Sequence, residues 1–374
     1  MKIVIAPDKF KGTLSAPAVA RAAEAGVKQA FPDAEIVAVP MADGGEGTVD
    51  AMLAARGGNR YGVVVTGPLG DSVKAEFGIL ADGTAVVEMA QASGLNLVPE
   101  GKRDPTVTTT FGTGEIIEAA LDLGARTFII GIGGSATCDG GIGVAQALGI
   151  KIRRRGGGEV GFGGGELIKI ESIDITGIDP RVKTAKFLVA SDVDNPLYGP
   201  NGAAHVFAPQ KGATAEQVIE LDQGLIHLAR IIKDDLGIDV SNLAGGGAAG
   251  GLGAGLVAFL GAAIRPGAEL IIDAVGLREK IEGADLVITG EGQIDVQSIH
   301  GKTPISVARL ASELSVRVLA IAGRLGDGYQ KVFEFGVTEL VSLSQIAGSD
   351  DLAMKNPVFY IEKAVSETVK KLLR

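Results

Sequence analysis

Short apolar runs alternate with segments of helical spacing at the start of the chain. KIVIAP (2–7) predicts a buried strand, and the alanine-rich segment Ala16–Phe31 predicts a helix. EIVAVPM (35–41) predicts the next strand, and ADGGEGTVDAMLAA (42–55) leads into another helix. This strand–helix–strand–helix order is typical of a parallel α/β sheet.

The same alternation returns near the other end of the chain. DLVIT (285–289) predicts a strand followed by the loop GEGQIDVQS, and a helix is expected after Pro304. RVLAIAG (317–323) and ELVSLS (339–344) predict two more strands, each followed by a helix. The two ends of the chain therefore share one architecture.

The middle of the chain has a different pattern. Residues 62–90 consist of consecutive β-rich runs joined by Gly-rich and Asp-Gly turns, which indicates antiparallel strands. Further strands are expected at TFIIGI (127–132) and KFLVA (186–190), and helices at Gly114–Leu123 and Ala215–Leu236. The middle therefore predicts a second domain with a mixed sheet.

We therefore expect an α/β protein of two domains. Residues 1–68 and 284–374 would form a Rossmann-like, doubly wound parallel sheet, split by an inserted α/β domain of residues 69–283, with the active site in the cleft between the two. A linear split into two successive domains is the alternative. The length of 374 residues suits two domains better than one core.

Composition and charge exclude several classes of partner. The formal net charge is −10, which argues against nucleic acid and anionic membranes, and aromatic residues make up only 4% of the chain. Cys138 is the sole cysteine, so an intrachain disulfide is excluded. Because the N-terminal apolar run is short and no run reaches the length of a membrane span, we expect a cytoplasmic protein. A homo-oligomer is compatible with the sequence.

Charged residues follow each predicted strand of the outer domain. In an open parallel sheet, ligands bind outside the carboxyl ends of the strands, so these residues are expected at one edge. The glycine content supports loops that approach a ligand closely, because 56 glycines are roughly twice the usual ~7% of a chain. The residues at this edge are Asp8, Lys9, Lys11, Asp43, Gly44, Gly45, Glu46, Glu291, Gln293, Asp295, Lys302 and Arg324.

The inserted domain has two comparable loops. GGSATCDGG offers Ser135, Thr137 and Asp139, and SDVDNPL offers Ser191, Asp192, Asp194 and Asn195. Paired carboxylates, lysines and glycine-rich backbone amides suit phosphate together with Mg²⁺. The alternative for any single aspartate is a helix cap or an Asx turn.

Other motifs are incomplete. HGKTP (300–304) lacks the leading glycine of a phosphate-binding loop. GIGGSA (131–136) fits a dinucleotide fingerprint, but Lys151–Arg155 stand where its ribose-binding acid belongs. The three histidines are not spaced as metal ligands are. None of them lies near Cys138 in the sequence, where it could activate the thiol.

Eight segments in order resemble the bacterial glycerate kinase family. They are IAPDKFKGTLSA, PMADGGEGT, FGTGEII, GIGGSAT.DGG, SDVDNPLYGPNGAA, FAPQKGA, GAAGGLG and DLVITGEGQID.QS..GK.P, and the resemblance extends from residue 3 to at least residue 323. It implies ATP-dependent phosphorylation of D-glycerate, commonly at the 2-hydroxyl, with Mg²⁺. It also implies a Rossmann-like domain split by a second domain.

Phosphoryl transfer depends on positioning and charge neutralisation, which guides the roles expected within this resemblance. Asp192 is expected to orient the glycerate hydroxyl as a base, with Asp295 as the rival. Lys9 and Lys11 are expected to bind the glycerate carboxylate or the nucleotide phosphates, and Arg324 is expected to stabilise the transferring charge. Mg²⁺ is assigned to Asp43, Glu46 and Asp194. The residues expected to bind substrate or phosphate are Asp8, Lys11, Gly44, Gly45, Ser135, Thr137, Ser191, Glu291 and Lys302.

Two departures and several alternatives remain open. Some relatives carry Arg where this chain has Gln293, which weakens a phosphate-neutralising role there, and many carry Asn in place of Cys138. The product is 2-phosphoglycerate or 3-phosphoglycerate, and another small hydroxy acid is the alternative substrate. A non-catalytic sensor of a sugar acid and a dinucleotide-dependent oxidoreductase are the rivals from other classes.

Overall fold

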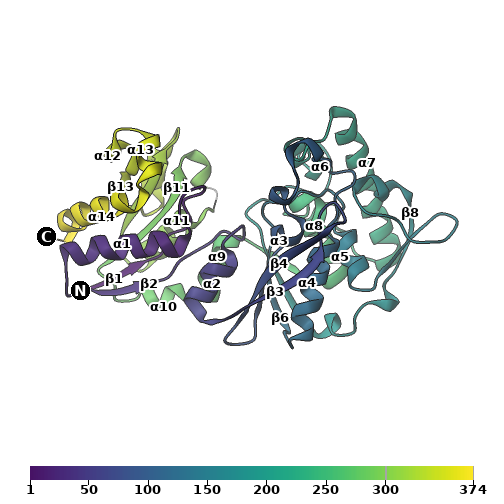
Figure 1. Ribbon diagram of the computed structural model, residues 1–374, viewed down its shortest axis with the longest axis horizontal. Coiled ribbons are helices and arrows are strands. Elements are labelled where there is room, and N and C mark those ends of the chain that lie inside the picture. Colours follow the sequence, from purple (N-terminus) through teal and green to yellow (C-terminus); the bar gives the residue numbers. More distant parts are fainter. Residues whose placement is uncertain (300, 374) are drawn as a thin grey trace. The chain divides into compact units, whose positions relative to one another are not determined.

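The computed structural model describes residues 1–299 and 301–373, which form two compact units (Figure 1). Unit 1 consists of Met1–Asp43, Asp50–Gly57 and the chain from Pro266 onward. Unit 2 consists of Gly44–Val49 and Gly58–Arg265. Unit 1 is therefore assembled from both ends of the chain.

Unit 1 is built on a parallel sheet with the strand order β13-β12-β11-β1-β2. Every neighbouring pair in this sheet runs parallel. The chain moves from β1 to β2 on one side and later adds β11 on the other side of β1, so the topological switch point lies between β1 and β11. The strands are β1 (Lys2–Ile5), β2 (Glu35–Ala38), β11 (Leu286–Ile294), β12 (Arg317–Leu325) and β13 (Glu339–Ser342).

Helices cover both faces of this sheet. Helix α1 (Ala16–Ala30) and helix α14 (Pro357–Leu373) lie side by side and share a core with Ile3, Ile5 and Ile288 (Figure 1). Helix α11 (Thr303–Glu313) packs against β11 and β12. The three inner strands β12, β11 and β1 contain buried runs of β-branched and aliphatic residues, as expected for a sheet covered on both sides, whereas the edge strands β2 and β13 are partly exposed. The remaining helices of unit 1 are most of α2 (Thr48–Arg56), α9 (Gly267–Val275), α10 (Leu277–Ile281), α12 (Leu343–Ala347) and α13 (Asp350–Lys355).

Unit 2 contains a mixed sheet of six strands in the order β10-β9-β6-β5-β4-β3. The first four in this order run parallel, whereas β3, β4 and β5 form an antiparallel meander. The strands are β3 (Gly58–Thr66), β4 (Ser72–Leu80), β5 (Ala85–Glu88), β6 (Thr127–Gly131), β9 (Lys186–Ala190) and β10 (Ala263–Arg265).

A large apolar core joins the helices of unit 2 to its sheet. Phe128 of β6 stacks on Phe187 of β9 with ring centroids 4.8 Å apart, and both are buried. A separate hairpin is formed by β7 (Lys151–Arg154) and β8 (Ile170–Asp174). The helices are α3 (Ala90–Ser93), α4 (Phe111–Asp122), α5 (Ile142–Ala147), α6 (Ala203–Phe207), α7 (Ala215–Leu236) and α8 (Ala248–Leu260).

The predicted fold class is confirmed, whereas the limits of the units differ from the expected domain limits. Strand β3 pairs with β4 along its whole length, so residues 58–66 belong to unit 2 and not to the outer sheet. Residues 266–283, expected in the inserted domain, belong to unit 1. Strand β11 continues through GEGQI to Ile294, where a loop was expected, because it pairs with the equally long β12.

Candidate active site

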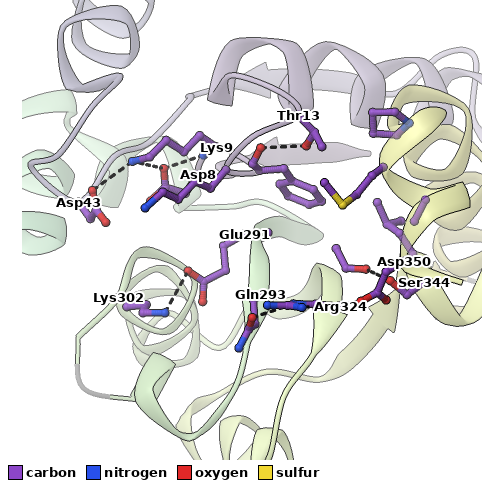
Figure 2. A pocket seen from close by; sticks show the side chains of 18 residues that line it. Asp8, Lys9, Thr13, Asp43, Glu291, Gln293, Lys302, Arg324, Ser344 and Asp350 are labelled. Atoms are coloured by element: carbon purple, nitrogen blue, oxygen red, sulfur yellow. Dashed lines mark hydrogen bonds and ion pairs between the residues drawn. The ribbon is translucent and has the colours of Figure 1, made fainter. Parts of the chain in front are cut away.

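Unit 1 contains a pocket of about 590 Å³ beside the switch point of its sheet (Figure 2). Its wall includes the segment after β1 and the outer part of β11, two strands that pair directly. The backbone N–H of Asp8 donates to the carbonyl of Gly290 at 2.8 Å, which continues this pairing to the pocket. Several residues expected at the strand ends therefore line one pocket of unit 1.

Asp8 is a buried carboxylate held from two sides. Its Oδ1 accepts from the backbone N–H of Lys9 at 2.6 Å, and its Oδ2 accepts from the hydroxyl of Thr303 at 2.9 Å. Only 5% of the residue is exposed. Burial raises the pKa of Asp8 to about 6, although the Lys9 ammonium opposes this shift.

Glu291 is a second buried carboxylate in the same wall. Its Oε1 accepts from the hydroxyl of Ser298 at 2.7 Å, and its Oε2 lies 3.8 Å from Nζ of Lys302. Burial raises the pKa of Glu291 to about 7, and the negative charges of Asp8 and Asp43 act in the same direction. A cation bound beside these carboxylates would oppose this shift.

Lysines lie among these carboxylates. Nζ of Lys9 is 3.4 Å from Oδ1 of Asp43 and 3.9 Å from Oδ1 of Asp8. Lys302 and the exposed Lys11 also line the pocket. Figure 2 shows Asp43, Lys9 and Lys302 on one side of the pocket. This side can hold phosphate oxygens with its ammonium groups.

A chain of polar side chains links the tips of β11 and β12. Nε of Arg324 donates to Oε1 of Gln293 at 2.8 Å, and Nε2 of Gln293 donates to Oδ2 of Asp295 at 2.7 Å. Arg324 also lies 3.7 Å from Asp350. Asp295 accepts from the backbone N–H of Ser298 and is not part of the pocket wall, so it orders this turn.

Unit 2 gathers its candidate residues at the carboxyl ends of β5, β6 and β9. The backbone of Gly44 packs so closely on Ala190 that an added Cβ would lie 2.6 Å from the Ala190 Cβ. A Cβ on Gly131 would lie 2.2 Å from the carbonyl oxygen of Gly44. Oε1 of Glu88, at the end of β5, accepts from the backbone N–H of Val49 at 2.8 Å. Residues 44–49 are therefore fixed against this edge.

Lys211 is a buried residue that the sequence reasoning did not single out. Its Nζ donates to the hydroxyl of Ser135 at 2.7 Å and to the carbonyl of Thr137 at 2.6 Å. The residue is 2% exposed, and burial lowers its pKa to about 8. Lys211 therefore fixes the loop after β6. Its only signal in the sequence is its place in the motif FAPQKGA.

The loop after β6 also contains two groups with structural roles. Asp139 is buried and accepts from the backbone N–H and the hydroxyl of Thr110, both at 2.8 Å, and from the backbone N–H of Gly141 at 3.1 Å as in an Asx turn, so it holds the loop in place. Cys138 is buried, and burial raises the pKa of its thiol to about 12. A thiol of this kind does not act as a nucleophile near neutral pH, as the sequence indicated.

The remaining predicted residues of unit 2 lie near the surface. Ser191 follows β9, and its backbone N–H donates to the carbonyl of Arg265 at the end of β10 at 3.0 Å. Asp192 is half-buried, whereas Asp194 and Glu46 are exposed. His300, in the declined motif HGKTP, lies outside the described residues.

The structure thus divides the predicted residues between the two units. Among the predicted residues, those that share the pocket of unit 1 are Asp8, Lys9, Lys11, Asp43, Glu291, Gln293, Lys302 and Arg324. Those that belong to unit 2 are Gly44, Gly45, Glu46, Ser135, Thr137, Ser191, Asp192 and Asp194.

The residues expected to hold Mg²⁺ do not form a ready-made ligand cluster. Within residues 1–299 and 301–373, no three carboxylate, histidine or cysteine side chains are placed to hold a metal ion together. Mg²⁺ that accompanies a nucleotide usually takes one or two carboxylates and completes its shell with phosphate oxygens and water. The partly exposed carboxylate of Asp43 in the pocket wall fits that requirement.

Comparison with known proteins identifies the family of the chain. The family model described as "Glycerate kinase family" matches residues 3–373. The chain belongs to the glycerate kinase family. It is therefore a kinase that uses ATP as co-substrate, which confirms the resemblance read from the eight motifs.

Relatives in the glycerate kinase family are similar over almost their whole length. Glycerate 2-kinase of Escherichia coli is 54% identical over 95% of this chain and 93% of its own, and glycerate kinase of Bacillus subtilis is 49% identical over 98% and 96%. A crystal structure provisionally named glycerate kinase 2, from Salmonella typhimurium LT2, matches all of this chain and 98% of its own with a TM-score of 0.90 at 47% identity. No helix among the described residues could cross a membrane.

Proposed function

We propose that this kinase transfers the γ-phosphoryl group of ATP to the 2-hydroxyl of D-glycerate, giving 2-phosphoglycerate and ADP, with Mg²⁺. The observation that carries the proposal is the pocket at the switch point of unit 1, where Lys9 lies beside Asp8 and Asp43, Lys302 lies beside Glu291, and Lys11 lines the same wall. The name of the Escherichia coli relative, glycerate 2-kinase, supports the choice of hydroxyl.

The lysines of the pocket would bind the phosphate oxygens. Asp43 and Asp8 keep the Lys9 ammonium within 3.9 Å of both carboxylates, and Glu291 lies near Lys302. Cations that are already held in position lower the free energy of the transition state, in which the negative charges of the phosphates are brought together. Mg²⁺, when bound, would neutralise further negative charge on the phosphates. Asp43 is its proposed ligand, and Glu46 and Asp194 are the further ligands proposed from the sequence.

Asp192 is the proposed base for the glycerate hydroxyl. It follows β9 directly, and the neighbouring Ser191 is fixed by the backbone of Arg265. The loops fixed by Lys211 and by Glu88 place Ser135, Thr137 and the Gly44–Gly45 backbone at the same edge of unit 2, where they would bind substrate oxygens. Asp295 is the rival base, but its bonds to Gln293 and Ser298 give it a positioning role.

Phosphorus NMR of the products from ATP, Mg²⁺ and D-glycerate tests the proposal. We expect a new phosphomonoester signal coupled to a single proton, as 2-phosphorylation requires. Coupling to two protons would instead establish 3-phosphoglycerate. If no transfer occurs while glycerate binds, another hydroxy acid or a sensor of sugar acids replaces the proposal.

Two aspartate variants test the base. Asp192→Asn should lower kcat about 10²- to 10⁴-fold with little change in the KM for ATP, because a general base acts only in the transition state. Asp295→Asn is the matched comparison and should lower kcat much less. The reverse order of effects would move the role to Asp295, and an unchanged kcat in Asp192→Asn would remove it from Asp192.

A further inference from the structure

We propose that the apolar end of the unit 1 pocket binds the adenosine part of ATP, with the phosphates directed toward the lysine end. This inference rests on the proposed use of ATP by the same pocket. The pocket has two chemically different ends, and Figure 2 shows Ser344 and Asp350 on the side opposite Asp43 and Lys9.

The end near Ser344 and Asp350 has apolar side chains from short helices beside the ion pair of Asp350 with Arg324 at 3.7 Å. The Ser342 hydroxyl at the end of β13 accepts from the backbone N–H of Gln345 and begins α12, and the Ser349 hydroxyl caps α13 in the same way. These caps fix the two helices beside the pocket. The apolar residues that line it are Phe10, Leu343, Ala353, Met354 and Pro357.

Met354 is the most informative of these residues. It lines the pocket, yet 57% of it is exposed, whereas Phe10, Leu343 and Ala353 are all less than 5% exposed. The core of unit 1 therefore does not need this thioether for packing. A flexible, polarisable thioether at the rim of a pocket packs well against a flat aromatic base.

The loop after β1 joins the two ends of the pocket. The backbone N–H of Phe10 donates to the carbonyl of Leu14, and the hydroxyl of Thr13 donates to the carbonyl of Phe10 at 2.8 Å, so the loop has a fixed form. Phe10 lies in this loop between Lys9 and Lys11, and all three line the pocket. One ordered loop therefore brings two lysines and a largely buried aromatic ring to the same pocket wall.

Size and polarity decide which ligand fits. A volume of about 590 Å³ suits a molecule the size of a nucleotide, since pockets for such ligands measure roughly 300–1,000 Å³. D-glycerate is a small acid with an oxygen on every carbon, and it would leave the apolar wall uncovered. A nucleoside triphosphate has an apolar base at one end and charge at the other, which matches both ends.

Binding of three probes to Met354→Gln and Leu352→Gln tests the proposal. Both residues lie on α13 and are exposed, but only Met354 lines the pocket, so Leu352 is the matched control. Calorimetry with ADP should show about tenfold weaker binding to Met354→Gln, a change of about 1.4 kcal/mol, and no change for Leu352→Gln. Tripolyphosphate, which has no base, should bind both variants as it binds the wild type.

Unchanged ADP affinity in Met354→Gln would overturn the proposal, as would an equal loss of tripolyphosphate or D-glycerate affinity. The proposed reaction is measured separately by product NMR on the wild-type protein. If D-glycerate proves not to be the acceptor while the ADP-specific loss is observed, the adenosine site stands and only the acceptor is wrong. If ADP does not bind the wild type, the adenosine site is rejected.

Discussion

Lys211 carries a buried ammonium group whose protonation should be visible in the stability of the protein. Burial lowers its pKa to about 8, whereas the unfolded chain keeps this proton up to about pH 10.5. Between these values the unfolded state binds more protons, so stability should rise with pH by up to about 3 kcal/mol. Lys211→Met should lack this rise. Urea unfolding of both proteins at about pH 7.5 and about pH 10 measures the difference.

A control accompanies this comparison. Lys233 is an exposed lysine on α7 paired with Asp239, so Lys233→Met should keep the wild-type slope in that pH range. Identical slopes in wild type and Lys211→Met would show that the buried amine keeps its proton throughout.

Protonation of Glu291 should make stability change with pH in the opposite direction, at lower pH. Burial raises its pKa from 4.5 to about 7, so the folded state binds more protons between these values. Stability should therefore fall as pH rises from about 4.5 to about 7, by about 3 kcal/mol. Glu291→Gln should flatten the curve when nucleotide and divalent cations are absent. Asp8 contributes in the same direction, because its pKa is raised to about 6, so part of the fall should persist in the variant.

The sequence predicted the pocket residues of unit 1 better than the groups that fix the loops of unit 2. Asp8, Lys9 and Glu291 follow or extend buried strands, and the ends of strands can be recognised from local pattern. Lys211 meets Ser135 across 76 residues of chain, a contact that no local pattern indicates. Asp139 was predicted as a ligand candidate, with a helix cap or an Asx turn as the alternative, and its bonds to Thr110 and Gly141 favour the structural alternative.

Among the loop elements, the segment at Gly44 depends on the absence of a side chain. Its φ is +85°, and a Cβ would lie 2.6 Å from the Ala190 Cβ and 2.9 Å from the Ala190 carbonyl oxygen. Gly44→Ala should therefore cost about 1–2 kcal/mol for the left-handed backbone and about 1–3 kcal/mol for overpacking. Urea unfolding measures the sum.

Gly124→Ala is the matched control for this prediction. Gly124 also lies in unit 2 and has a φ of +91°, but a Cβ there would meet nothing within 4 Å. Gly124→Ala should therefore lower the free energy of unfolding only by the cost of placing alanine in a left-handed backbone conformation. Equal losses in the two variants would mean that the loop at residues 44–49 moves to accommodate a methyl group.

Some elements were predicted closely and others were not, for physical reasons. Helix α7 spans Ala215–Leu236, the range that its amphipathic period predicts, and the meander of β3 to β5 follows its turn signals. The outer part of β11 was missed because GEGQ has the composition of a loop. Its strand form depends on pairing of Gln293 with Arg324 in β12, which is a non-local contact.

Across the whole chain, the two units differ in whether they are built from one stretch of sequence or from several. Apart from residues 44–49, unit 2 is a single stretch of chain, whereas the sheet of unit 1 needs strands from both ends. We expect residues 58–265 expressed alone to unfold in one cooperative thermal transition, monitored by circular dichroism. Residues 1–57 alone should show no such transition, since β1 and β2 would lack β11. A gradual, non-cooperative melt of 58–265 would contradict this expectation.

The pairing of Ile3 with Leu286 has a consequence for synthesis on the ribosome. Strand β1 leaves the exit tunnel first, and its apolar side chains remain without a neighbour on the β11 side until almost 300 further residues have been translated. At roughly 5–20 residues per second, that wait is on the order of tens of seconds. The inserted unit is being synthesised during that time and can be complete by its end, while β1 has only β2 as a neighbour in its sheet and is exposed to chaperones. The nascent chain thus depends on protection of its first few residues far more than the finished molecule does.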